Sequence, residues 1–378
     1  MISELILYWQ HRLKTQLKKR KNPSVKGNSM WYETALTKKL EINYPIIQAP
    51  MAGITTPELV AAVSNADALG SLGAGYMTPE QIHESVAAIK KLTKKPFQVN
   101  LFVPNEYEVD QAKIKKVNEL MKPFRDALKL PEPKVIEQYS VDFDKQMEAV
   151  LDFNVKIVSF TFGIMPSRWI KLCKQKEIFL IGTATSGHEA QLLEKAGVDF
   201  VIAQGAEAGG HRGSFLEDEL LLSAVEALPQ VVKNIELPVI SAGGMMTPDD
   251  VFAALHLRAS AVQMGSAFLL SAEANTSEPY RKAISKLKDN ETVMTRAFSG
   301  RSARSVFNEF VDVLTAHDDI IPDYPIQNAY TRDIRRAAAL QNKPEYMSLW
   351  AGSFAYLAKP KPAGDIVKEL VDKLDQMF

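Results

Sequence analysis

Eight short apolar runs alternate with amphipathic segments of helix length from residue 45 onward, and this repetition constrains the fold more than any other feature. The runs are continuously apolar, which is typical of parallel strands covered on both faces. They occupy residues 45–49, 69–73, 97–103, 157–162, 179–183, 200–203, 238–242 and 261–264. Strand and helix repeated eight times predict an α/β fold of the (β/α)8, or TIM-barrel, type. An open doubly wound sheet is the alternative, and eight even units favour closure.

Three intervening helices begin with the same signal, a threonine followed by proline and an acidic residue. Threonine is a good N-cap and proline suits the first helical turn, so each triplet marks a helix start. The triplets are Thr56-Pro57-Glu58, Thr78-Pro79-Glu80 and Thr247-Pro248-Asp249. A further helix is expected to open at residue 187 and to end at Gly197.

Two regions depart from this rhythm. Residues 104–155 are longer than one crossover and are expected to add a helix or two on the barrel rim. After residue 270 the strand pattern stops, and residues 271–350 are expected to be mostly helical. The predicted organisation is a basic N-terminal extension at 1–29, a barrel at 30–270, and a smaller, mainly helical cap with a C-terminal segment at 271–378.

The composition excludes several classes of function. Forty-five basic residues balance forty-five acidic ones, which gives no reason to expect nucleic-acid binding. The single cysteine, Cys173, excludes an internal disulfide and a cysteine-rich metal site, and it indicates a reducing, cytoplasmic location. No HExxH motif or histidine pair suggests a metal. No apolar stretch reaches the roughly 18 residues that span a bilayer. The extension is a membrane-surface helix, an organelle-targeting peptide or a dispensable segment.

Glycine-rich and polar residues follow the predicted strands, where barrel enzymes build their active sites. The sixth strand leads into Gly209-Gly210-His211, a turn in which glycine permits close backbone approach. A histidine there can exchange a proton near neutral pH, so His211 is the candidate acid or base. The last two strands end in Gly243-Gly244 and Gly265-Ser266, and loops at these positions often bind phosphate.

The phosphate ligand is expected to be a single-phosphate cofactor. Neither a GxGxxG motif after an early strand nor a Walker sequence is present. Flavin mononucleotide (FMN) and pyridoxal phosphate are the two candidates. Pyridoxal chemistry needs a lysine, and none stands at the eight strand ends. Asn100 and Gln204 carry amides that can hydrogen-bond a flavin ring.

Together these motifs resemble the nitronate monooxygenase family, formerly called 2-nitropropane dioxygenases, over roughly residues 40–355. Two later stretches, 296–301 and 349–352, also look like this family. The resemblance implies FMN, with phosphate contacts at Gly244, Gly265 and Ser266 and flavin contacts at Asn100, Gln204 and Gly209. It makes His211 the expected catalytic residue. The full set of expected cofactor-binding residues is Ala49, Pro50, Met51, Asn100, Gln204, Gly209, Gly243, Gly244, Gln263, Met264, Gly265 and Ser266.

The resemblance also implies the reaction. An alkyl nitronate, such as propionate 3-nitronate, would be oxidised by O2 to a carbonyl compound and nitrite, and His211 would orient the nitro group or take the α-proton. One alternative is an NAD(P)H-dependent reductase of the same fold, acting on an enoyl-carrier-protein or a quinone. Another is a flavin-binding barrel without catalysis. The motif at 349–352 favours the monooxygenase.

Overall fold

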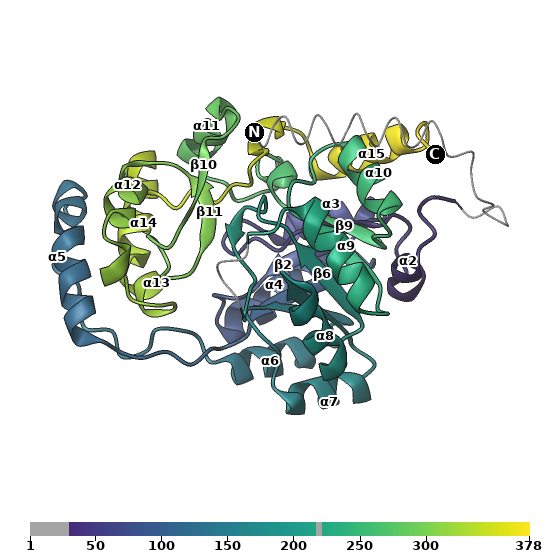
Figure 1. The fold of residues 1–378 in the computed structure, drawn as a ribbon, viewed down its shortest axis with the longest axis horizontal. Helices are drawn as coiled ribbons and strands as arrows, with labels where there is room; N and C mark the ends of the chain where they lie inside the picture. The colour runs from purple at the N-terminus through teal and green to yellow at the C-terminus, as the bar shows by residue number, and fades with distance from the viewer. Residues whose placement is uncertain (1–29, 217–220) are drawn as a thin grey trace.

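Eight parallel strands form a closed barrel in the computed structural model, which describes residues 30–216 and 221–378 (Figure 1). The expected basic extension, 1–29, lies outside the described residues. The strands run in the spatial order β1-β9-β8-β6-β5-β4-β3-β2. Their bounds are β1 (Ile46–Gln48), β2 (Gly70–Gly73), β3 (Phe97–Phe102), β4 (Ile157–Thr161), β5 (Phe179–Ala184), β6 (Phe200–Gln204), β8 (Val239–Ala242) and β9 (Ala261–Met264). The predicted barrel is therefore confirmed.

The seam between β1 and β2 closes the barrel through few contacts. Ile47 and Leu69 form an isolated parallel bridge, and the Gln48 N–H donates to the Leu69 carbonyl at 3.0 Å. The side chain of Gln48 adds a further bond, because its Oε1 accepts from the Ser71 N–H at 2.9 Å. Gln48 is fully buried, so its amide takes the place of a strand-to-strand bond at the seam.

Helices surround the barrel, and the three threonine–proline starts are confirmed. Thr56, Thr78 and Thr247 each accept a backbone N–H three residues later. The Gly197 C-cap of the helix at residue 187 has φ +97°, a left-handed conformation that suits glycine. The surrounding helices are α3 (Pro57–Asn65), α4 (Pro79–Leu92), α6 (Phe143–Asp152), α7 (Ser167–Gln175), α8 (Gly187–Ala196), α9 (Ala224–Asn234), α10 (Pro248–His256) and α15 (Ala363–Leu374). A further helix, α2 (Ala35–Leu40), instead packs Leu36 and Leu40 with the side chains inside the barrel.

The buried apolar side chains form three hydrophobic cores. One fills the barrel interior and includes Leu69, Ile181 and Phe200. A larger one lies between the strands and the surrounding helices. The third forms between α5 and the elements that follow residue 268, and it contains Phe298 and Phe310. Alternation of side chains along each strand separates the first core from the second.

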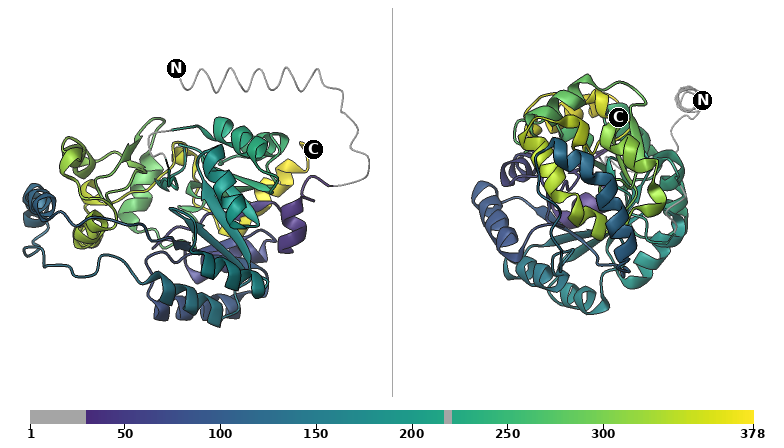
Figure 2. Two further views of the ribbon diagram at one scale, coloured as in Figure 1. Left: turned by 60° about the horizontal axis from the view of Figure 1, so that its bottom comes forward. Right: turned by 90° about the vertical axis from the view of Figure 1, so that its left-hand side faces the viewer.

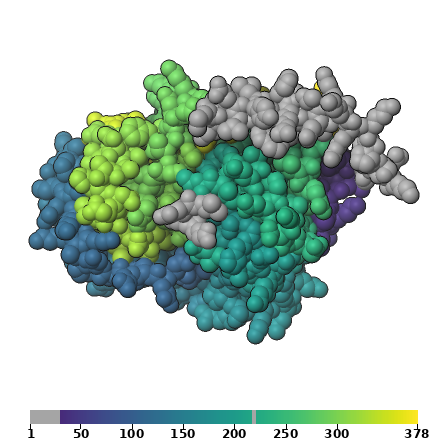
Figure 3. Space-filling view, in the orientation of Figure 1, coloured from purple at the N-terminus to yellow at the C-terminus, as the bar shows by residue number. Residues whose placement is uncertain are grey.

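The elements around the third core lie beside the barrel (Figures 2 and 3). They are α5 (Gln111–Ala127), α11 (Glu278–Lys286), β10 (Thr292–Thr295), β11 (Ala303–Val306), α12 (Glu309–Thr315), α13 (Ile326–Tyr330) and α14 (Arg332–Leu340). The expectation that strands stop at residue 270 is wrong, because β10 and β11 pair antiparallel and β11 also pairs with β7 (Gly210–His211). These strands have two to four residues, too few for a periodic pattern.

The domain boundaries at 30–270 and 271–378 remain a prediction. Two helices pack across this boundary: α5 belongs by sequence to 30–270 and α15 to 271–378, and each packs with elements of the opposite range. α5 packs in the third core, where buried Arg125 pairs with Asp333 of α14 at 2.5 Å. α15 packs instead against α3 and α10 of the barrel (Figure 1). Within 30–216 and 221–378, no helix is long and apolar enough to cross a membrane.

Candidate active site

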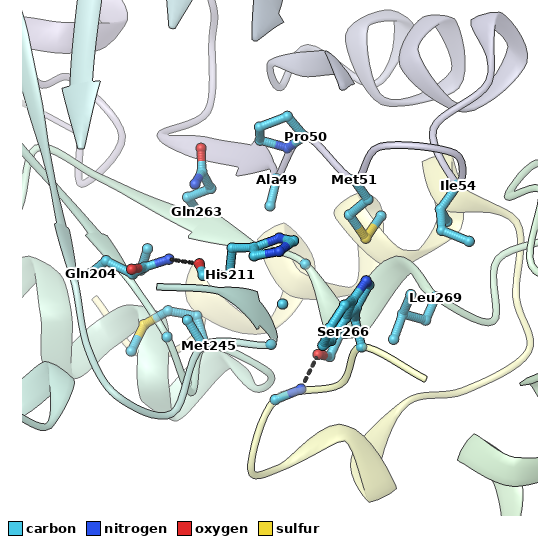
Figure 4. A pocket seen from close by; sticks show the side chains of 18 of the residues that line it. Ala49, Pro50, Met51, Ile54, Gln204, His211, Met245, Gln263, Ser266 and Leu269 are labelled. Atoms are coloured by element: carbon cyan, nitrogen blue, oxygen red, sulfur yellow. Dashed lines mark hydrogen bonds between the residues drawn. The ribbon is translucent and has the colours of Figure 1, made fainter. Parts of the chain in front are cut away.

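A cavity of about 190 Å³ opens at the carboxyl ends of the barrel strands (Figure 4). All but one of the site residues expected from the sequence line it: Ala49, Pro50, Met51, Asn100, Gln204, Gly209, His211, Gly243, Gly244, Gln263, Gly265 and Ser266. The exception is Met264, whose side chain packs in the core outside the barrel. Successive strand residues point to opposite faces, so Gln263 and Gly265 face the cavity while Met264 faces the helices.

The short strand β7 carries His211 across the mouth of the barrel. Gly210 and His211 pair with Arg304 and Ala303 of β11. Gly210 has φ +75°, and a Cβ on Gly209 would lie 2.5 Å from the Gly352 nitrogen. The two glycines are therefore required, one by backbone angle and the other by close approach.

Gln204 fixes this turn with both ends of its amide. Its Nε2 donates to the His211 carbonyl at 3.2 Å (Figure 4), and its Oε1 accepts from the Gly213 N–H at 2.7 Å. The sequence led us to expect this amide on a flavin ring. In the structure its direct partners are backbone groups of the turn, so its evident work is to position His211.

Aromatic rings enclose the His211 imidazole. Ring centroids of Trp350, Phe162, Tyr324 and Phe102 lie 5.2, 5.6, 6.1 and 6.3 Å from that of His211. The His211 Nε2 is shielded from solvent and has no hydrogen-bond partner among the described residues. An unpartnered, shielded ring nitrogen at a cavity is costly unless a ligand meets it.

The surroundings of His211 favour the neutral imidazole. Burial is the main cause, and the positive charges of Arg301 and Arg335 add to it; together they lower the pKa of His211 to about 3. Near pH 7 the ring therefore offers one N–H donor and one nitrogen acceptor, not a positive charge.

Gly243, Gly244 and Gly265, which follow β8 and β9, line the cavity, and we call them the glycine cradle. Gly243 and Gly244 have φ +97° and +74°, which side chains rarely adopt. Gly265 has an ordinary φ of −106°, and a Cβ there would meet only Ala49 at 3.4 Å and Met51 at 4.0 Å. Neither the backbone angle nor the packing requires glycine at 265. The absence of a side chain there leaves space in the cavity.

Ser266, Asn100 and Gln263 supply polar groups to the cavity. The Ser266 Oγ accepts from the Gly352 N–H at 2.9 Å, which leaves its O–H free to donate (Figure 4). The Asn100 Nδ2 donates to the Ser159 Oγ at 3.0 Å. The Gln263 Oε1 is shielded and has no partner among the described residues. Donors and acceptors thus remain available around an otherwise apolar cavity.

Arg301 and Phe162 contact the segment that carries His211, although neither lines the main cavity. The Arg301 guanidinium lies 4.2 Å from the Phe162 ring centroid and donates to the carbonyls of Arg212 and Ser214. Phe162 has φ +78°, an unfavourable backbone angle for an aromatic residue. From sequence, Arg301 in a region expected to be helical is either a surface residue or a group that meets an anionic substrate. Neither interpretation predicts that it binds the backbone of this segment. Both residues brace the segment that carries His211.

A second cavity, of about 80 Å³, adjoins the first. Tyr76 and Phe102 line both spaces. Tyr324, whose ring lies 6.1 Å from His211, also lines the second cavity. The His211 ring therefore stands at the boundary between the two spaces.

Metal and lysine chemistry find no support at the site. Across 30–216 and 221–378, no group of three or more His, Cys, Asp or Glu residues could hold a metal ion. No lysine is among the described residues that line the main cavity. A Schiff base with pyridoxal phosphate would need such a lysine, so the donor set suits flavin better.

Comparison with known proteins identifies the family. Residues 33–373 match the family model described as "Nitronate monooxygenase". A "Probable nitronate monooxygenase" of Staphylococcus aureus strain MSSA476 is 43% identical over 352 residues, which are 92% of this chain and 99% of that protein. The chain belongs to the nitronate monooxygenase family. The sequence-based resemblance is confirmed, and the protein is accordingly an oxidoreductase.

Solved structures show the same architecture as this nitronate monooxygenase family member. A nitroalkane oxidase from Streptomyces ansochromogenes has a TM-score of 0.84 and 33% identity, covering 91% of this chain and 98% of that chain. FabK from Thermotoga maritima has a TM-score of 0.71 and 27% identity, covering 91% and 97%. Both the identity and the TM-score are higher for the nitroalkane oxidase than for FabK.

Proposed function

We propose that this protein is an FMN-dependent nitronate monooxygenase. The observation that carries the proposal is the neutral His211 imidazole, whose shielded and unpartnered Nε2 faces the cavity beside the glycine cradle. Family membership supports the same reading. The substrate is an alkyl nitronate, such as propionate 3-nitronate, the oxidant is O2, and the products are a carbonyl compound and nitrite.

The residues present fit FMN. Gly243, Gly244, Gly265 and Ser266 would hold the phosphate, because backbone N–H groups and a serine hydroxyl can converge on it where no side chain intrudes. Ala49, Pro50, Met51, Asn100, Gly209 and Gln263 would surround the ring system, and Gln204 would act through the turn that it holds. When bound, the flavin supplies the redox chemistry of the reaction.

His211 would orient the nitronate. A neutral imidazole can donate its N–H to a nitronate oxygen without first taking up a proton. A pKa of about 3 makes the same ring a weak base for the α-proton of a neutral nitroalkane. The low pKa of His211 therefore favours a substrate that binds as the nitronate anion and needs no proton removed. The rings of Phe162, Tyr324 and Trp350 exclude water from the imidazole and strengthen this hydrogen bond.

The test is His211→Asn. Turnover of propionate 3-nitronate should fall while the flavin content per chain stays at the wild-type value, because the cradle lies on other strands. Steady-state oxygen uptake and the visible absorbance of the purified protein measure the two quantities. Unchanged turnover on nitronate and nitroalkane alike would remove His211 from the mechanism.

A reductase is the second candidate. The resemblance of the Glu207–His211 segment to flavin-dependent enoyl-carrier-protein reductases and the similarity to FabK favour it. Such an enzyme needs a nicotinamide donor to reduce its flavin before any acceptor is used. Anaerobic addition of NADH or NADPH decides: rapid bleaching of the flavin supports the reductase, and a flavin that stays oxidised supports the monooxygenase.

A further inference from the structure

The segment that carries His211 is fixed along its length. We call residues 209–216 the His211 strap. Its first part pairs with β11, and the Arg212 N–H donates to the Ser302 carbonyl at 2.9 Å. Gln204 and Arg301 hold its middle. Its end, at Phe215 and Leu216, contacts a different part of the barrel.

Glu189 holds that end. This residue lies in the first turn of α8 and is 1% exposed. Its Oε1 accepts from the backbone N–H of Phe215 at 2.5 Å and of Leu216 at 3.0 Å. Both donors are main-chain groups, so the contact fixes the path of the strap.

The other carboxylate oxygen ties Glu189 to the end of β5. Its Oε2 accepts from the Thr185 N–H at 2.6 Å and from the Thr185 Oγ1 at 2.9 Å. All four partners are donors, so both carboxylate oxygens act as acceptors. The positive end of α8 stabilises that charge. Among the described residues, Glu189 forms no salt bridge, so its charge serves the backbone contacts.

We infer that Glu189 is a positioning residue for His211: its carboxylate fixes the end of the strap to the β5–α8 turn, and the strap in turn fixes the imidazole at the cavity. The inference rests on the proposed function only for its kinetic readout. A displacement of about 1 Å at a reacting group can cost as much as a hundredfold in rate, so the contact has catalytic consequences without touching substrate.

The test compares Glu189→Gln with Glu194→Gln. A glutamine cannot accept at its NH2 end, so Glu189→Gln leaves one pair of donors without an acceptor. Glu194 is the matched control, since it lies on the same helix and its Oε1 accepts from the N–H of Glu236 at 2.8 Å and of Leu237 at 3.3 Å, away from the strap. Glu189→Gln should lower kcat/KM for nitronate roughly tenfold or more, and Glu194→Gln should leave it within twofold.

A double mutant with His211→Asn distinguishes a role in positioning His211 from a general loss of structural order. In a His211→Asn background, Glu189→Gln should cost less than a further twofold. The inference is overturned if Glu189→Gln folds with wild-type kcat/KM, or if it costs the same factor in both backgrounds. Should Glu189→Gln fail to fold, Thr185→Val, which removes only the hydroxyl donor, should show a smaller loss with the same non-additivity; additive loss would overturn the inference.

A second readout does not depend on activity. The NMR signals of the His211 imidazole in flavin-loaded protein should shift in Glu189→Gln and match wild type in Glu194→Gln. Wild-type protein that oxidises no nitronate would refute the proposed function while leaving this comparison intact. Identical imidazole signals in all three proteins would refute the positioning role alone.

Discussion

Acid should destabilise this protein through His211. The native pKa of His211 is about 3, while a histidine in the unfolded chain titrates near 6.5. Between these values the unfolded state binds a proton that the native state does not, so the free energy of unfolding falls as the pH falls. At pH 7 the effect is close to zero. At pH 5, 1.5 units below the unfolded pKa, it amounts to about 2 kcal/mol.

The assay is a double difference. Urea unfolding of wild type and His211→Asn is measured at pH 7 and pH 5 with saturating FMN. Other titrating groups contribute to both proteins and cancel. Wild type should lose about 2 kcal/mol more than His211→Asn over this interval. His188→Asn removes an exposed imidazole and should retain the wild-type loss.

The refuting result is equal acid sensitivity in wild type and His211→Asn. It would mean that the imidazole is protonated in the native state at pH 5, and the role of His211 as a neutral hydrogen-bond donor would fall with it. A direct imidazole titration by NMR would then show the pKa that the ring has.

Three further changes test the cradle, the turn and the barrel. Gly265→Ala should weaken FMN binding without unfolding the protein, since a Cβ at 265 meets only ordinary contacts; flavin content and the Kd of added FMN report it. Gln204→Leu leaves the Gly213 N–H without its acceptor and should cost about 1–3 kcal/mol in urea unfolding, with lower kcat/KM. Gly70→Ala places a methyl 2.2 Å from the Val60 carbonyl oxygen and should lower the Tm by several degrees, equivalent to roughly 1–3 kcal/mol.

The barrel could be predicted because its signals are local. Each strand is a continuous apolar run, and the threonine at 56, 78 and 247 caps its helix with a bond three residues away. The pairing of β7 with β11 could not, because it joins residues about ninety positions apart in the chain. Sequence patterns of two to four residues do not specify such pairing.

The site shows the same limit. Residues at the strand ends were predicted to line one cavity, and the closed barrel brings them together. The alternation of side chains would have removed Met264 in advance, since Gln263 and Gly265 occupy the inward positions. The positioning roles of Gln204, Glu189 and Arg301 could not be predicted, because each side chain binds backbone groups elsewhere in the chain. In the sequence, Glu189 looks like an ordinary acidic residue in the first turn of a helix.

Oxygen consumption tests the central claim most directly. Purified flavin-loaded protein is given propionate 3-nitronate in air-saturated buffer without nicotinamide, and oxygen uptake and nitrite are followed together. The proposed function predicts rapid uptake with nitrite release, lost in His211→Asn. No uptake, together with bleaching of the flavin by NADH or NADPH without oxygen, would contradict it and identify a reductase.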